Sequence, residues 1–177
     1  VVRALVEASV LVVVILYLFL GGVRAALVVA ATLPLSMLAT FLLMRYVGLT
    51  ANLMSLGGLA IALGMLVDAS VVVVENIETA LAHKQEDVSS ANSVDRFSLI
   101  RDAVSAVSAP MLAGVSIIAI VFLPLLTLQG LEGKLFAPVA LTIVLALSAS
   151  VLIAFTVVPA LASLLLRSHA SDAPWLM

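Results

Sequence analysis

Five long apolar stretches make up most of the sequence, and they constrain its fold more than any motif does. They cover residues 4–20, 25–44, 52–74, 104–126 and 137–166. A helix needs roughly 20 residues to cross a hydrocarbon layer ~30 Å thick, and each stretch is near that length or longer. Because an open strand in lipid leaves its backbone groups without hydrogen-bond partners, these stretches must be helical. The sequence therefore predicts an all-α, polytopic transmembrane helix bundle with five transmembrane helices.

The composition agrees with this fold and excludes several classes of protein. The 177 residues are 64% hydrophobic and 10% charged, whereas a soluble domain carries about 25% charged residues. A net charge of −2 without a basic patch gives no support for nucleic-acid binding. Since the sequence has no cysteine, it offers no disulfide, no thiolate metal site and no cysteine nucleophile. We expect no cofactor, and the absence of an initiator Met indicates a fragment.

One long polar insert, residues 76–103, separates the third apolar stretch from the fourth. Its centre has the composition of a solvated loop. From Val94 onward, apolar residues recur at helical spacing, which predicts an interfacial amphipathic helix before the fourth span. Five of the eight Lys and Arg residues are expected on the same side of the membrane as this insert, and three on the other side. The positive-inside rule then places the insert and the tail 167–177 in the cytoplasm.

An aspartate interrupts the third apolar stretch, in the sequence GMLVDASVVVVEN at residues 64–76. Asp68 is the only ionisable residue between Asn52 and Val74. An acid near the middle of a membrane costs about 2.5–3.5 kcal/mol on insertion scales, so it is kept where it is used or where a partner offsets the cost. A carboxylate balanced between desolvation and a nearby cation can take up and release a proton near neutral pH. The alternative is a buried acid that only hydrogen-bonds to a neighbouring helix.

Helical spacing places this aspartate on a stripe of small residues. Gly57, Gly64, Asp68 and Glu75 fall on one face, and small residues let another helix approach closely. We therefore expect Asp68 to point at protein, with Gly57 and Gly64 packing around it. Glu75 lies two turns further on, about 10 Å away, and is either an interfacial acid or a second relay position. No Lys or Arg lies within a span, so a partner of Asp68 is a polar residue or lies outside this chain.

The residues do not indicate an enzyme. Intramembrane aspartyl proteases need two membrane aspartates, and only Asp68 qualifies. The H-E-x-x-H zinc motif is absent, and His83 and His169 both lie outside the spans. A channel or a purely structural membrane protein stays open as a distant alternative.

The third apolar stretch and its neighbours resemble one transporter family. LMSLGGLAIALGMLVDASVVVVENIETAL resembles the fourth transmembrane helix of the resistance–nodulation–division (RND) efflux transporters, and VD-x-x-V-V-V-V-E-N is its most specific part. LVEASVLVVVILYLFLGGVRAALVVAATLPLSMLATFLLM resembles the second and third helices. FLPLLTLQGLEGKLFAPVALTIV resembles the fifth helix and the start of the sixth. The resemblance reaches about Leu166 and implies helices two to six of the first half of a twelve-helix transporter.

This resemblance implies a secondary antiporter of the bacterial inner membrane. It would be a homotrimer that couples proton entry to export through a periplasmic adaptor and an outer-membrane channel. The acid that matches Asp68 is a proton-relay residue in the family, and Glu75 matches a second acid implicated in metal-exporting members. The first helix, the periplasmic substrate-binding region and the second half of the transporter would lie outside this chain.

One position bears on the subfamily. Multidrug members have two adjacent aspartates here, whereas Ala69 follows Asp68 in this chain. Together with MSLGG and QGLEGKLF, the single aspartate resembles the heavy-metal efflux branch, with a multidrug exporter as the alternative. Copper and silver exporters carry methionines along this helix that pass the soft ion. Met54 fits one such position, or is an ordinary packing methionine. Met65 is one residue away from another, and Val73 replaces a third, which leaves zinc, cobalt, nickel and cadmium open as substrates.

Overall fold

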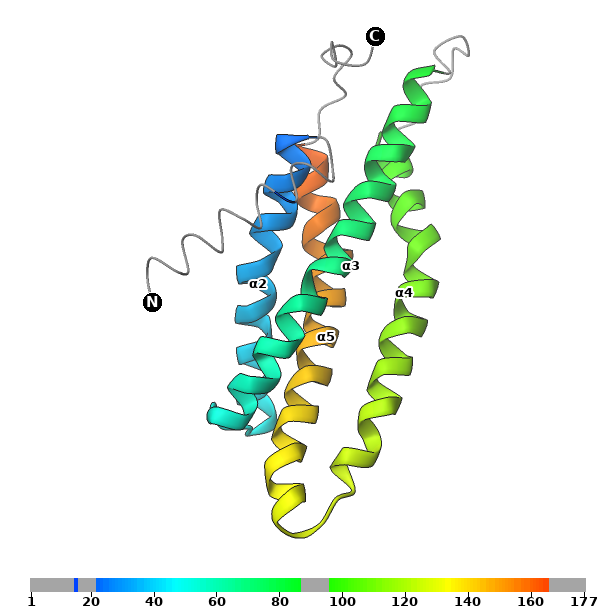
Figure 1. Cartoon of the computed structure of the whole chain (residues 1–177). Helices are drawn as coiled ribbons and strands as arrows, with labels where there is room; N and C mark the ends of the chain where they lie inside the picture. Colours follow the sequence, from blue (N-terminus) through cyan, green and yellow to red (C-terminus); the bar gives the residue numbers. More distant parts are fainter. Residues whose placement is uncertain (1–14, 16–21, 87–95, 166–177) are drawn as a thin grey trace.

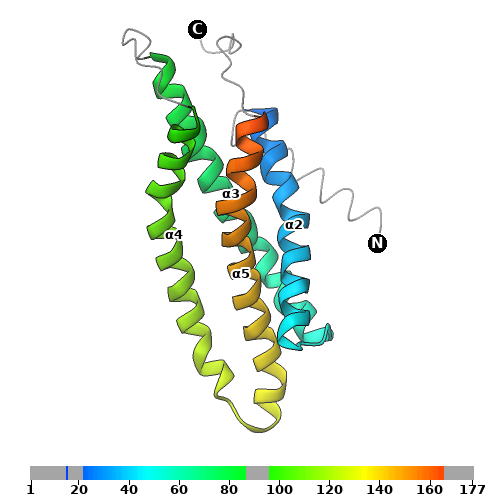
Figure 2. The ribbon, with the colours of Figure 1, turned by 180° about the vertical axis from the view of Figure 1, so that it is seen from behind.

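Four long helices form the bundle seen in Figures 1 and 2. The computed structural model describes residue 15, residues 22–86 and residues 96–165. The helices are α2 (Val23–Val47), α3 (Leu53–Glu86), α4 (Arg96–Leu126) and α5 (Gly130–Leu165). Each is long and apolar enough to cross a membrane, and no strand occurs within the described ranges. The predicted all-α transmembrane bundle is confirmed, whereas nearly all of the first predicted span, 4–20, and the tail 167–177 lie outside these ranges.

Helices that are neighbours in sequence run in opposite directions, so α3 and α5 are parallel (Figure 1). We call the end of the bundle that carries Glu86 and Arg96 the insert end. At the opposite end, α2 closes at Gly48, whose φ of +77° is the left-handed conformation that glycine adopts without strain. A reciprocal cap then starts α3. The Asn52 side chain accepts the Ser55 N–H at 2.9 Å, and the Ser55 hydroxyl oxygen accepts the Asn52 N–H at 2.8 Å.

The helices extend further into the polar insert than the apolar stretches do. α3 continues about three turns beyond residue 74, through ETALAHKQE. This segment contains good helix formers and neither Gly nor Pro, so nothing in it stops the helix. The amphipathic segment that was predicted as a separate interfacial helix is instead continuous with the fourth span in one helix, α4. Both helices therefore project beyond the spans predicted from hydropathy.

α5 is the central helix and packs against α2, α3 and α4. Half of its most apolar window is buried, compared with none of the corresponding window of α4. Small residues line the buried face of α5 and permit close helix contacts. They include Ala140, Ala146, Ala149, Ser150, Ala154 and Ala162. Tight packing thus concentrates around α5, and α4 lies at the edge of the bundle.

α3 and α5 approach each other closely at Gly58. A Cβ atom added to this residue would lie 2.7 Å from the carbonyl oxygen of Val139 and 3.3 Å from Cβ of Thr142. The nearest obstacle is backbone, which cannot rotate away as a side chain can. Only glycine permits this helix spacing, so Gly58 sets the distance between the two helices.

Replacing Gly58 with alanine should destabilise the folded transporter by about 1–3 kcal/mol, because the new methyl group overpacks the contact with α5. Gly114 on α4 is the matched control, since nothing lies within 4 Å of its added Cβ. Alanine there should be neutral or stabilising by up to about 1 kcal/mol, owing to its higher helix propensity. Unfolding of the solubilised protein in SDS, followed by circular dichroism, measures both. Equal free energies of unfolding for the two variants would contradict the contact.

Candidate functional site

Asp68 lies near the middle of α3 and borders a cavity of about 360 Å³ between α3, α4 and α5. From α3 the cavity is lined by Met65, Asp68, Ala69 and Val72. From α4 it is lined by Met111, Gly114, Val115 and Ile118, and from α5 by Leu147, Ser150 and Val151. The only ionisable group in this lining is the carboxylate of Asp68. The other side chains of this lining are apolar apart from the Ser150 hydroxyl.

The side chain of Asp68 is also exposed within the described chain. The carboxylate therefore has the cavity on one side and an open face of α3 on the other. No Lys or Arg lines the cavity. Across residues 22–86 and 96–165, no group of three or more His, Asp or Glu could hold a metal ion.

The structure places the predicted packing glycines on the open face of α3. Gly57 and Gly64 are exposed, and nothing lies within 4 Å of a Cβ added to either. In the described part of the chain the close helix contact occurs at Gly58, one residue away. One residue corresponds to about 100° around a helix, and the stripe drawn through Asp68 therefore missed it. Packing of another helix on Gly57 and Gly64 stays a prediction about segments outside the described ranges.

Two acids lie between Asp68 and the insert end. Glu75 is exposed, and Glu78, one turn further along α3, is half-buried. The Glu78 carboxylate is 3.6 Å from the position of a Cβ on Gly22, so it lies beside the start of α2. Sequence reasoning missed Glu78 because it assigned this residue to the polar insert. Its spacing of three residues from Glu75 on a continuing helix was the available signal.

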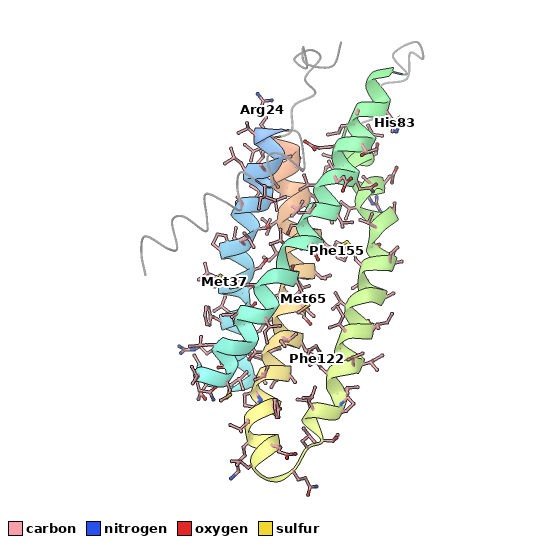
Figure 3. The ribbon with its side chains drawn as sticks, in the orientation of Figure 1. Arg24, Met37, Met65, His83, Phe122 and Phe155 are labelled. Atoms are coloured by element: carbon pink, nitrogen blue, oxygen red, sulfur yellow. The ribbon has the colours of Figure 1, made fainter. Side chains whose placement is uncertain are left out.

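The methionines of α3 are separated along the helix. Met54 is half-buried in the first turn, whereas Met65 borders the cavity together with Met111 of α4. Figure 3 shows Met65 near the middle of the bundle and His83 far along α3 toward the insert end. His83 is exposed, and it does not line the cavity. The structure does not bring Met54 together with Asp68.

The chain matches a known protein family and several characterised proteins. Residues 1–175 match the AcrB/AcrD/AcrF family. The chain is 46% identical over 169 residues to Protein HelA of Legionella pneumophila. It is 43% identical over 171 residues to the cobalt-zinc-cadmium resistance protein CzcA of Cupriavidus metallidurans. It is 41% identical over 160 residues to the cation efflux system protein CusA of Escherichia coli.

These alignments cover 95%, 96% and 89% of this chain, respectively, but only 16%, 16% and 15% of the relatives. The chain thus spans about a sixth of the length of these relatives. The membrane helices, the aspartate in the third apolar stretch and the family match all lead to the same assignment, and the resemblance drawn from the sequence is confirmed. The chain belongs to the AcrB/AcrD/AcrF family of RND transporters, as a segment from its heavy-metal efflux branch.

Proposed function

We propose that the full protein is an inner-membrane pump that exports heavy-metal cations in exchange for protons, and that Asp68 binds the transported proton. One observation carries this proposal: an ionisable carboxylate on a membrane helix borders a cavity between three helices. The names of two relatives refer to cobalt, zinc and cadmium resistance or to cation efflux, and this supports metal as the substrate. The chain itself would supply the proton-handling part of the machine.

The cavity explains how protonation could alter the shape of the bundle. A protonated Asp68 is neutral, so α3, α4 and α5 can close around it at little cost. An ionised Asp68 requires water or a cation, which favours a wider cavity or contact with a partner on the open face of α3. Since α4 is the least buried of the four described helices, movement of α4 would uncover the fewest buried side chains. Proton binding would therefore shift the bundle between two arrangements.

The remaining parts of the proposal follow from the family. Glu75, exposed and nearer the insert end, is the proposed second acid of the relay. The full transporter would be a homotrimer that works with a periplasmic adaptor and an outer-membrane channel. The insert end and the tail 167–177 would face the cytoplasm. A helix from outside the described ranges would cover Gly57, Gly64 and the open side of Asp68.

The residue at one position of α3 supports divalent ions rather than copper and silver as the substrate. Val73 stands where the methionine path of copper and silver exporters has a further Met, and its side chain is fully buried in the apolar core. No sulfur ligand is present at that position to pass a soft ion. Zinc, cobalt, nickel and cadmium bind imidazole or carboxylate ligands as well, so their transport does not depend on this path.

Asp68→Asn keeps the size of the side chain and removes its ability to ionise. In cells that carry the full transporter, metal export driven by a proton gradient should fall to the level of cells without the gene. Asp102→Asn is the matched control, because Asp102 is an exposed acid on α4 that does not line the cavity. It should leave export unchanged. Immunoblots of the membrane fraction check insertion, and normal export by inserted Asp68→Asn would rule out the relay.

The substrate proposal predicts a pattern of metal tolerance. A strain that lacks its own metal exporters and receives the full gene should grow at higher concentrations of zinc, cobalt, nickel or cadmium. Tolerance of copper and silver should not rise. Growth curves across these six ions, with dye and antibiotic efflux measured in parallel, distinguish the branches. Unchanged growth in every metal together with new dye or antibiotic export would establish the multidrug alternative instead.

A further inference from the structure

The two buried side chains of α4 lie near its insert end, whereas its later contacts with the bundle are made by partly buried side chains such as Val115, Ile118 and Phe122. Its only buried side chains within the described ranges are Ile100 and Ala103, which belong to a core cluster shared by all four helices. From Val104 to Leu126 every side chain of α4 is half-buried or exposed. The cavity beside Asp68 lies along this loosely packed part. Contacts in the first turns of α4 therefore contribute to its position at the cavity.

A side chain of α3 bonds to the backbone of α4 at that end. The Asn76 amide nitrogen, Nδ2, donates to the carbonyl oxygen of Ala103 at 2.5 Å, across 27 residues of sequence. A carbonyl can only accept, so the amide group must present its nitrogen. Asn76 is half-buried and lies beside the buried residues Val73 and Ile77 on α3. In apolar surroundings an amide that loses its partner is not readily compensated by water.

This hydrogen bond lies on the same seam between the two helices as the cavity. On α3, Asn76 follows Met65, Asp68 and Val72 at spacings of three or four residues, which places all four on one face. On α4, Met111 lies eight residues beyond Ala103, a rise of about 12 Å. Asn76 is likewise eight residues beyond Asp68. The bond thus closes the seam at the insert end, and the cavity begins beyond it.

The part of α4 beyond the bond can bend. Pro110 lies inside α4, between Ala103 and the cavity-lining segment. Because proline has no backbone N–H, the carbonyl of Ala106 loses its helical hydrogen bond, which weakens the helix at that point. α4 is therefore hydrogen-bonded to α3 near its insert end, weakened at Pro110 and only partly buried at the cavity.

We propose that Asn76 is a positioning residue for Asp68. Its hydrogen bond to Ala103 is the fixed point about which the rest of α4 moves, and it sets the width of the cavity that Asp68 borders. The mechanical role of Asn76 is independent of the transported substrate. Its effect on transport rests on the proposed function of Asp68.

The test follows cavity width in the full transporter through a reporter cysteine. Val115→Cys is introduced into a cysteine-free version, because Val115 lines the cavity from α4. The rate of alkylation by N-ethylmaleimide is measured in membranes, with and without Asn76→Leu, which is similar in size but has no donor. The rate should rise about threefold, the factor expected for loss of one interhelical hydrogen bond in a membrane. Asn76→Gln, which retains the amide donor, should bring the rate back toward the original value.

Two controls separate this role from general loosening of the protein. A cysteine at Val121, an exposed α4 residue that does not line the cavity, should react equally in both backgrounds. Thr40→Val removes a buried hydrogen bond to Ser36 within α2 alone, and it should leave the Val115→Cys rate unchanged. If Asn76→Leu does not insert, Asn76→Ala replaces it.

The outcomes decide the proposal separately from the proposed function. An unchanged Val115→Cys rate in an inserted Asn76 variant would overturn the role of the hydrogen bond. Equal increases at Val115→Cys and Val121→Cys would overturn it too, since they would indicate general loosening. A further outcome is that the Val115→Cys rate rises selectively while the Asn76 variant of a metal-exporting transporter still exports metal at the original rate. That result would show that cavity width does not serve transport. A parent that exports no metal would refute the proposed function, while the alkylation rates would still decide whether Asn76 positions α4.

Discussion

The hydrocarbon interior offers no water to satisfy a polar group, and this constraint governs the whole structure. In the described part of the chain, the backbone satisfies its own N–H and C=O groups by forming four long helices. Most hydroxyl groups find a hydrogen-bond partner within their own helix. Thr32 donates to the Val29 carbonyl, and Thr40 donates to the Ser36 carbonyl. Two polar side chains of α3, Asn76 and Asp68, are among the exceptions to this rule. Asn76 reaches across to α4, and Asp68 borders a cavity. The candidate mechanism is built on these two exceptions.

The distribution of small and large residues explains which helices are fixed and which are free to move. α5 places small side chains against its three neighbours, and the glycine contact with α3 leaves no room for adjustment. α4 carries large apolar side chains that face outward, including Ile117, Ile120 and Val121. In a membrane such residues are solvated by lipid as well as by protein, so their packing adds little to helix association. A closely packed pair of helices thus lies beside a less buried one, with the carboxylate at their junction.

Much of the fold could be predicted from the sequence, because apolar length determines membrane helices directly. Hydropathy could not show where the helices end, since ETALAHKQE is polar and yet continues α3 into the insert. Asp68 was predictable as the candidate site, because a lone acid in an apolar span is costly. The cavity was not, since it depends on how α4 and α5 pack against α3. The bond between Asn76 and Ala103 joins residues far apart in sequence, and no local pattern predicts it. That the close helix contact lies at Gly58 and not at Gly57 likewise depends on how the helices pack, which the sequence does not show.

The unequal burial of α4 and α5 has a consequence for how such a sequence can drift. An enlarged side chain on the inner face of α5 pushes against three helices at once, so few replacements are permitted there. Along the outer face of α4 an exchange of one apolar side chain for another disturbs no buried side chain of the described bundle. Variation among natural versions of this segment should therefore accumulate on one side of the bundle, leaving the central helix nearly unchanged.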